Sequence, residues 1–112
     1  MLSQINRLRK KKDFEKLFKE GKSFKSTFLV LKAVKNNLKE NRFGFIVSKK
    51  VSKKAILRNK IKRNLRDIVR QNIKDIKSGV DVVLIVLPDF GKKNFSEIKE
   101  ILNNLLKKAG LI

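Results

Sequence analysis

The chain has 112 residues, enough for one domain with a modest core, and 41% of them are hydrophobic, which argues against disorder over the whole length. It contains no Cys and no His, so disulfides, thiolate metal sites and a histidine general base are excluded. Its formal net charge of +20 makes a polyanion the expected partner.

The distribution of the charge decides whether it reflects a binding surface or only a lysine-rich composition. Lys accounts for 23 of the 30 basic residues, which fits a general bias. Residues 48–74, however, carry eleven basic groups and one acidic group, and this +10 is half of the net charge. Four of the seven Arg fall between positions 58 and 70, and Arg suits forked contacts with phosphate. A concentrated basic surface is therefore the better interpretation.

The first half of the chain predicts one helix and two strands. About residues 1–10 form a basic arm that we expect to be flexible. Apolar spacing predicts a helix over about Lys12–Glu20, with Gly21 placed to end it. Alternation predicts a strand over about Phe24–Val34, and a polar turn then leads to a second strand, about Arg42–Ser48, that would pair back on the first as a hairpin.

The second half predicts a long helix, one strand and a final helix. Ser52 can cap the long helix, which runs to about Lys74. The apolar run Val82–Leu87 is typical of a strand buried on both faces. Asn94 and Glu97 have the spacing of a capping box for the final helix, which would stop at Gly110. The order αββαβα predicts a single α+β domain over residues 1–112, with helices packed on a central sheet.

The long helix would present a continuous cationic face. At about 100° per residue, its apolar residues fill one arc and the next arc is basic. Asp67 is the only acidic residue in this helix, whereas a face that merely contacts solvent usually mixes both signs. Such a ridge can follow a phosphate backbone. The residues of this arc are Asn59, Lys62, Arg63, Arg66 and Arg70.

The sequence offers little for catalysis by the protein itself or for a membrane. Its ten acidic residues are scattered, and no P-loop, glycine fingerprint or nucleophile motif is present. The longest apolar run is far shorter than a membrane span, and the chain turns basic before any apolar stretch of signal-peptide length. We therefore expect a cytoplasmic protein.

Two stretches make the sequence recognisable. Gly44–Val51 reads GFIVSKKV, and Ala55–Arg66 follows the pattern A-x-x-R-N-K-x-K-R-x-x-R. Together they closely resemble the signature of the protein subunit of bacterial ribonuclease P. The resemblance extends to Asp13-Phe14, Phe18 and Gly21, and it spans most of the chain in the same order.

This resemblance implies a ribonucleoprotein enzyme whose chemistry is carried by RNA. In that family the RNA subunit, with bound magnesium, hydrolyses precursor tRNA to give the mature 5′ end. The protein would hold the 5′ leader in a cleft between the first helix and the sheet, and its basic helix would lie against the catalytic RNA. No catalytic residue and no metal ligand are then expected in the protein. The family also implies a left-handed crossover between the second and third strands, where general rules favour a right-handed one.

Site residues follow by position from the resemblance. The leader-cleft residues would be Phe14, Phe18 and Phe28; by spacing alone, Phe14 and Phe18 would be ordinary core residues. Several family members have an aromatic where this chain has Leu31, and many have Gly in the turn that here reads Ser52-Lys53-Lys54. The RNA-binding residues would be Lys49, Lys50, Arg58, Asn59, Lys62, Arg63 and Arg66, to which the cationic face adds Arg70.

Two other classes of function are compatible with a basic amphipathic helix. A non-catalytic, ribosome-associated RNA-binding protein could use the same helix in a groove of folded RNA. RNA that co-purifies with the protein would separate these interpretations, because one predicts a single ribozyme and the other rRNA. A helix lying on an anionic membrane is disfavoured, because the apolar face is needed for the core. DNA is not an expected partner.

Overall fold

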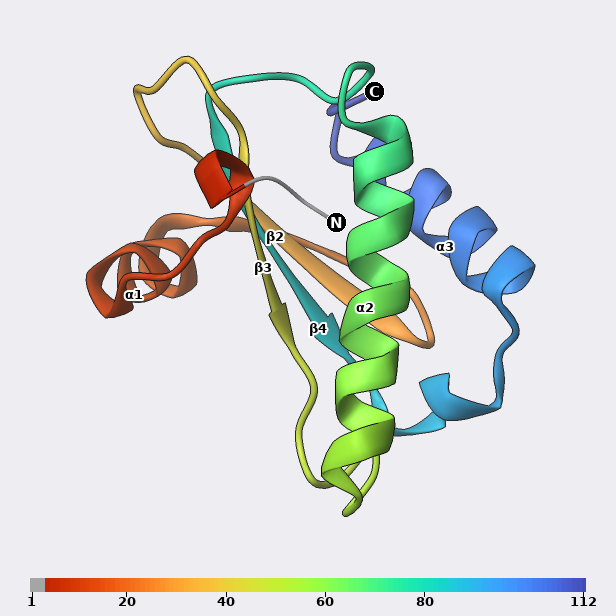
Figure 1. The fold of residues 1–112 in the computed structure, drawn as a ribbon. Coiled ribbons are helices and arrows are strands. Elements are labelled where there is room, and N and C mark those ends of the chain that lie inside the picture. Colours follow the sequence, from red (N-terminus) through yellow and green to blue (C-terminus); the bar gives the residue numbers. More distant parts are fainter. Residues whose placement is uncertain (1–3) are drawn as a thin grey trace.

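A computed structural model describes residues 4–112 and shows one four-stranded sheet with helices on both faces (Figure 1). The mixed α+β class predicted from the sequence is confirmed. In chain order the elements are η1 (Gln4–Asn6), α1 (Lys11–Glu20), β1 (Lys22–Lys25), β2 (Leu29–Lys35), β3 (Arg42–Ile46), α2 (Ala55–Asn72), β4 (Val80–Val86), η2 (Pro88–Lys92) and α3 (Phe95–Lys108).

The strand predicted over Phe24–Val34 is in fact two strands joined by a tight turn. β1 pairs antiparallel with β2, and the Ser26 side chain closes the turn between them. Its Oγ accepts hydrogen bonds from the backbone N–H groups of Phe28 and Leu29, at 3.2 and 3.0 Å. Serine competes in this way with the ladder of a sheet, which is why the alternating pattern breaks at this residue.

The predicted hairpin between β2 and β3 is wrong. The strands lie in the order β1-β2-β4-β3, so β4 separates the two. Leu84 of β4 faces Leu31 of β2 in antiparallel pairing and Phe45 of β3 in parallel pairing. β4 takes the central position because it is the most apolar strand, buried on both faces as its continuous run of hydrophobic residues predicts.

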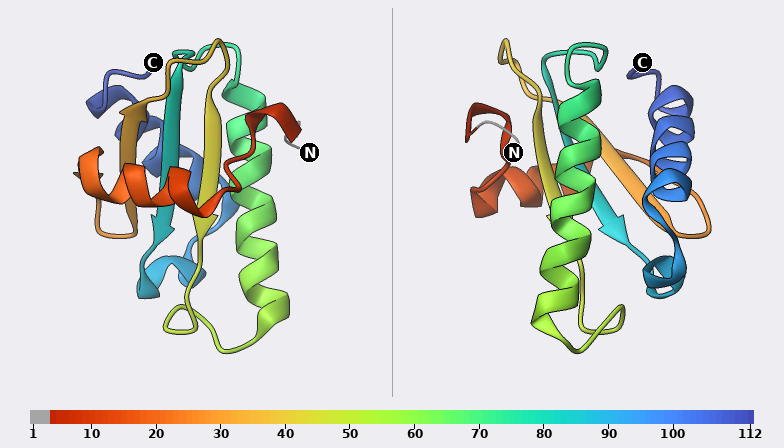
Figure 2. Two further views of the ribbon diagram at one scale, coloured as in Figure 1. Left: turned by 90° about the vertical axis from the view of Figure 1, so that its left-hand side faces the viewer. Right: turned by 45° about the vertical axis from the view of Figure 1, so that its right-hand side comes forward.

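The connection from β3 through α2 to β4 is a left-handed crossover. In the left panel of Figure 2 both strands run downward, β4 (teal) lies to the left of β3 (yellow), and α2 lies behind the sheet. Viewed from the helix side with the strands pointing up, the chain therefore moves leftward. The crossover expected from the family resemblance is present, against the general preference for right-handed ones.

The N-terminus of α3 is capped by side chains, whereas the N-terminus of α2 is not. At the start of α3 the Asn94 side chain accepts from the N–H of Glu97, whose carboxylate accepts from the N–H of Asn94, so the predicted capping box forms. Gly110 follows α3 with a φ of +71°, a conformation that favours glycine. The predicted cap of α2 is wrong: the N-cap residue is Lys54, and Ser52 lies before the helix, where its Oγ accepts from the N–H of Lys54.

The segment before α1 lies along β3. The N–H of Leu8 donates to the carbonyl of Phe43 at 2.9 Å, and the side chain of Asn6 donates to that of Asn41 at 3.0 Å. Leu8 is buried in the core under α1. Residues 4–8 of the expected flexible arm therefore make domain contacts in the structure, whereas residues 1–3 lie outside the described residues.

Candidate nucleic-acid interface

The cationic face of α2 is formed as predicted. Arg63, Arg70 and Asn59 are exposed, and Lys62 and Arg66 are half-buried beside them. None of the four cations forms an ion pair with another residue in the described range 4–112. The apolar arc of the same helix, including Leu65, Ile68 and Val69, is buried against the sheet and α3. The basic arc must therefore face outward, where unneutralised charge can meet phosphates.

The residues at the approach to α2 divide into two groups. Lys49 and Lys50 are exposed in the loop after β3 and can reach an external phosphate. Arg58 instead donates from Nη1 to the carbonyls of Ser52 and Lys53, at 2.9 and 3.0 Å. It therefore holds the loop onto the first turn of α2, and only its remaining donors face outward.

A hollow of about 340 Å³ continues the cationic face past the edge of β3. The guanidinium of Arg66 lies 5.8 Å from the ring centre of Phe45, where a cation is attracted to the aromatic face. On the other side the hollow is bounded by Arg7, Arg9 and the ring of Phe14. Residues distant in the sequence thus form one basic and aromatic surface from α2 to α1.

Phe14 and Phe18 both lie on the α1 side of the sheet, above different strands. The ring of Phe14 occupies the space over Gly44 on β3, where an added Cβ would be only 2.6 Å from its Cε1 atom. Gly44 is therefore required for this ring to reach the sheet. Phe18 is 43% exposed, and the ammonium of Lys32 on β2 lies 5.3 Å from its ring centre. One aromatic is thus anchored and the other is open to a ligand.

Part of the sheet beside α1 remains uncovered. α1 runs across the strands, and β3 and β4 extend below it in the left panel of Figure 2. Val30, Ile46 and Ile85 meet across three neighbouring strands and are only half-buried. They form an apolar floor next to the exposed ring of Phe18 and the cation of Lys32. An extended chain carrying bases and phosphates finds both kinds of contact here.

The structure does not bring Phe28 to this surface. Phe28 lies in the turn before β2 and packs against the core on the α2 and α3 side. The ammonium of Lys93 lies 4.3 Å from its ring centre. Leu31 is fully buried on that same side, so the departure from family members with an aromatic at this position does not alter the surface under α1.

One network next to the site was missed by the sequence analysis. Arg42 donates from Nε and Nη2 to the two carboxylate oxygens of Asp81, at 2.8 and 2.7 Å, and from Nη1 to Asp13 of α1 at 3.3 Å. Asn36 donates to Asp81 as well, at 2.9 Å. The hydrogen bond to Asp81 raises the pKa of Arg42 above its ordinary value. Because Asp13 immediately precedes Phe14, this network fixes α1 on the sheet.

Over residues 4–112 the structure shows no group of three or more Asp, Glu, His or Cys side chains that could hold a metal ion. Within the same residues, no helix is both long enough and apolar enough to cross a membrane.

The fold and these surfaces define a class: small α+β domains with a cationic helix on one face of the sheet and, on the other, an open apolar surface beside a short aromatic helix. The family model for Ribonuclease P matches residues 2–110. A Ribonuclease P protein component from Pseudanabaena is 41% identical over 100% of this chain and 97% of its own length. One from Clostridium botulinum is 43% identical over 95% and 96%. The chain belongs to the family of ribonuclease P protein components.

Solved structures agree with this assignment. A Staphylococcus aureus RNase P protein, a mutant described as defective in mRNA degradation, superimposes with a TM-score of 0.91 at 29% identity, covering 97% of this chain and 92% of that one. The Thermotoga maritima RNase P protein gives 0.84 at 39% identity over 91% and 96%.

Proposed function

We propose that this protein is the protein component of a ribonuclease P ribonucleoprotein. It binds the catalytic RNA subunit and the 5′ leader of precursor tRNA, and assists endonucleolytic removal of the leader to give the mature tRNA 5′ end. The observation that carries the proposal is the family match over residues 2–110, together with a cationic helix face that no described residue neutralises. This match favours ribonuclease P over the ribosome-associated alternative.

The two surfaces have separate roles in this proposal. Asn59, Lys62, Arg63, Arg66 and Arg70 on α2 contact the backbone of the RNA subunit, with Lys49 and Lys50 beside them. Phe14, Phe18 and the apolar floor below α1 take the leader. Leader sequences differ among precursor tRNAs, and stacking on an aromatic ring tolerates any base. Phe28, which packs against the opposite core, is not assigned to the leader.

Hydrolysis is assigned to the RNA subunit and its magnesium ions. The chain supplies no His or Cys to act as a general base or nucleophile. Asp13 and Asp81, the carboxylates of the network beside α1, are both paired with Arg42. The protein's contribution is then to hold RNA and substrate together, which raises the effective concentration of the leader at the reacting centre. A cytoplasmic location suits this substrate, and neither a membrane nor DNA is proposed as a partner.

The test is precursor tRNA cleavage at low magnesium with protein alone, RNA subunit alone, and both together. We expect strong cleavage only from the mixture. Arg63→Ala should weaken assembly and reduce the slope of log K against log salt by up to about 0.7–0.9, the value for one phosphate contact. Lys107→Ala on α3 removes an equal charge from an exposed position outside the proposed interface and should change neither quantity. Robust metal-dependent cleavage by RNA-free protein would disprove the proposal.

A further inference from the structure

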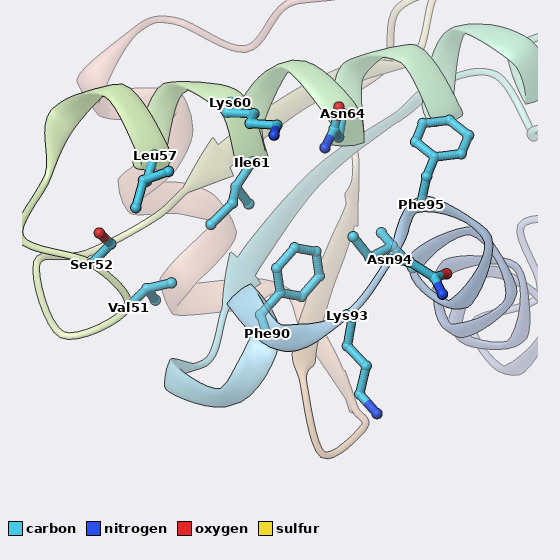
Figure 3. Close-up of a pocket in the computed structure, with 11 residues that line it drawn as sticks. Val51, Ser52, Leu57, Lys60, Ile61, Asn64, Phe90, Lys93, Asn94 and Phe95 are labelled. Carbon is cyan, nitrogen blue, oxygen red and sulfur yellow. The ribbon is translucent and has the colours of Figure 1, made fainter.

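A second recess lies on the flank of α2 that faces α3 (Figure 3). Its volume is about 460 Å³, and three segments form it: the loop before α2, the first half of α2, and the chain from η2 into α3. The cationic residues Arg66 and Lys62 lie on the opposite flank of the helix, toward β3. The recess is therefore separate from both surfaces assigned above.

Six of the residues that line this recess are apolar, and two of these side chains are unusually exposed to solvent. Leu57 is 44% exposed and Phe95 is 40% exposed, whereas Phe90 forms a fully buried floor. Figure 3 shows Leu57 and Ile61 pointing from α2 toward the segment that carries Phe90. Large apolar side chains left open around a concavity mark a binding site more often than scattered surface ones do.

Polar groups are placed on the same walls. Asn64 projects from α2 into the recess near Phe90 and Phe95, and its amide makes no hydrogen bond to any described residue. An amide offers both a donor and an acceptor, which matches the edge of a nucleobase. Lys60 is exposed at the rim and forms no ion pair within residues 4–112. Among the described residues that line the recess there is no carboxylate.

We propose that this recess binds one unstacked base of a single-stranded RNA segment. The base stacks on Phe95, Asn64 hydrogen-bonds its edge, and Lys60, one turn away on α2, contacts the adjoining phosphate. The recess adjoins the cationic face without being part of it, because Lys60 at its rim lies about 60° around α2 from Arg63. This inference rests on the proposed function only in taking RNA as the partner.

Charge and chemistry favour RNA over the other occupants of such a recess. A second copy of this chain would bring another +20 of charge to the same place. An apolar side chain or acyl tail in the recess would bury the Asn64 amide without offering it a partner, which is costly, and would not neutralise the charge of Lys60. A nucleotide satisfies the ring, the amide and the cation together.

A single tryptophan provides the direct test, because the chain has none. The Phe95→Trp protein is titrated with a short single-stranded RNA and with an abasic oligomer of the same length and charge. Leu38→Trp serves as the matched control, since Leu38 is 47% exposed in the β2–β3 turn. We expect RNA with bases to quench the indole emission of the Phe95→Trp protein and the abasic oligomer to leave it largely unchanged. The indole of the control protein should respond to neither.

Binding measured by anisotropy of a labelled oligomer gives a second readout that does not depend on the reporter. Phe95→Ala and Asn64→Ala should each weaken binding of the RNA with bases, Phe95→Ala by about fivefold or more. The same variants should bind the abasic oligomer as the unmodified protein does. Equal effects on both oligomers would overturn the inference.

Each of the remaining outcomes also distinguishes this inference from the alternatives. If the emission of the Phe95→Trp protein shifts with protein concentration in the absence of RNA, a second copy covers the recess and the inference is wrong. If both alanine variants leave RNA binding unchanged while the mixed cleavage assay succeeds, this inference fails and the proposed function stands. If the cleavage assay fails while RNA still quenches the Phe95→Trp protein, the recess binds RNA of another kind.

Discussion

The two faces of the sheet bury hydrophobic clusters of different size. The face toward α2 and α3 contributes most of the core, in which residues from β2, β3 and β4 pack against both helices. The face toward α1 has a second, small cluster whose buried members are Leu8, Leu17 and Val83. Residues of the same strands are thus sealed on one side and half-open on the other. The large core stabilises the fold and leaves the opposite face available for a ligand.

The central strand shows why this division is possible. Leu84 of β4 is fully buried under α2 and α3, whereas its neighbour Ile85 points the other way and is half-buried. A strand exposed to water on both faces could not carry so apolar a run. β4 lies between β2 and β3, with α1 on one face of the sheet and α2 and α3 on the other. α1 has ten residues and crosses the strands, so it covers only part of their length. The apolar floor of Val30, Ile46 and Ile85 is the part of this face that α1 leaves uncovered.

The comparison predicts unequal costs for the same substitution on the two faces. Leu102 of α3 and Leu17 of α1 are both fully buried, so each Leu→Ala change removes the same atoms. We expect Leu102→Ala to cost about 4 kcal/mol and Leu17→Ala about 2–3 kcal/mol, because the thin α1 layer can collapse into the space left behind. Urea unfolding in buffer containing sulfate measures both. Equal costs would show that the α1 layer is as rigid as the main core.

Disrupting the Arg42 network that joins α1 to the sheet should give the next largest loss of stability. Arg42→Met leaves the carboxylate of Asp81, which is 4% exposed, with Asn36 as its remaining side-chain partner. We expect a loss of about 2–3 kcal/mol, below the usual range for a broken buried pair because Arg42 is one-fifth exposed. Chemical denaturation provides the measurement. Asp13→Asn removes only the more exposed of the two ion pairs of Arg42, at 3.3 Å, and should lower the free energy of unfolding by under about 1 kcal/mol.

The features that the sequence predicted correctly are those that depend on interactions between residues close together in the chain. The capping box at Asn94, the two-sided burial of β4 and the cationic arc of α2 each depend on residues close together in the chain, and each is confirmed. The β2–β3 hairpin failed because a more apolar strand, distant in sequence, displaced the local pairing. The cap at Ser52 failed because Arg58 draws that loop onto the helix.

The candidate site was predictable in part for the same reason. Phe14 and Phe18 share a face of one helix, so any fold that seats the helix brings them to the sheet together. Phe28 is in a turn whose direction is set by the Ser26 side chain, and strand alternation does not extend to it. The Arg42 network joins three distant segments, and only the folded chain brings Asp13 and Asp81 to the same guanidinium.

The smallest effect on stability should accompany the most specific effect on binding. Phe18→Leu keeps much of the apolar volume of a side chain that is already 43% exposed, so we expect it to cost under about 1 kcal/mol. It also removes the aromatic face and the contact with Lys32. Binding of precursor tRNA by the assembled holoenzyme should weaken by about 1–3 kcal/mol, the contribution of one stacked base. Mature tRNA, which lacks the leader, should bind as before.

The ratio of the two tRNA affinities isolates the α1 face from every other change. Phe95→Leu is the matched control, because Phe95 is 40% exposed and lies beside α2 on the other side of the sheet. It should leave the ratio unchanged even if it alters assembly with the RNA subunit. If Phe18→Leu weakens precursor and mature tRNA equally, the ring contributes to packing and the leader lies elsewhere. If only the precursor is affected, the open face of the sheet is the leader surface, and the asymmetry between the two cores is what makes it available.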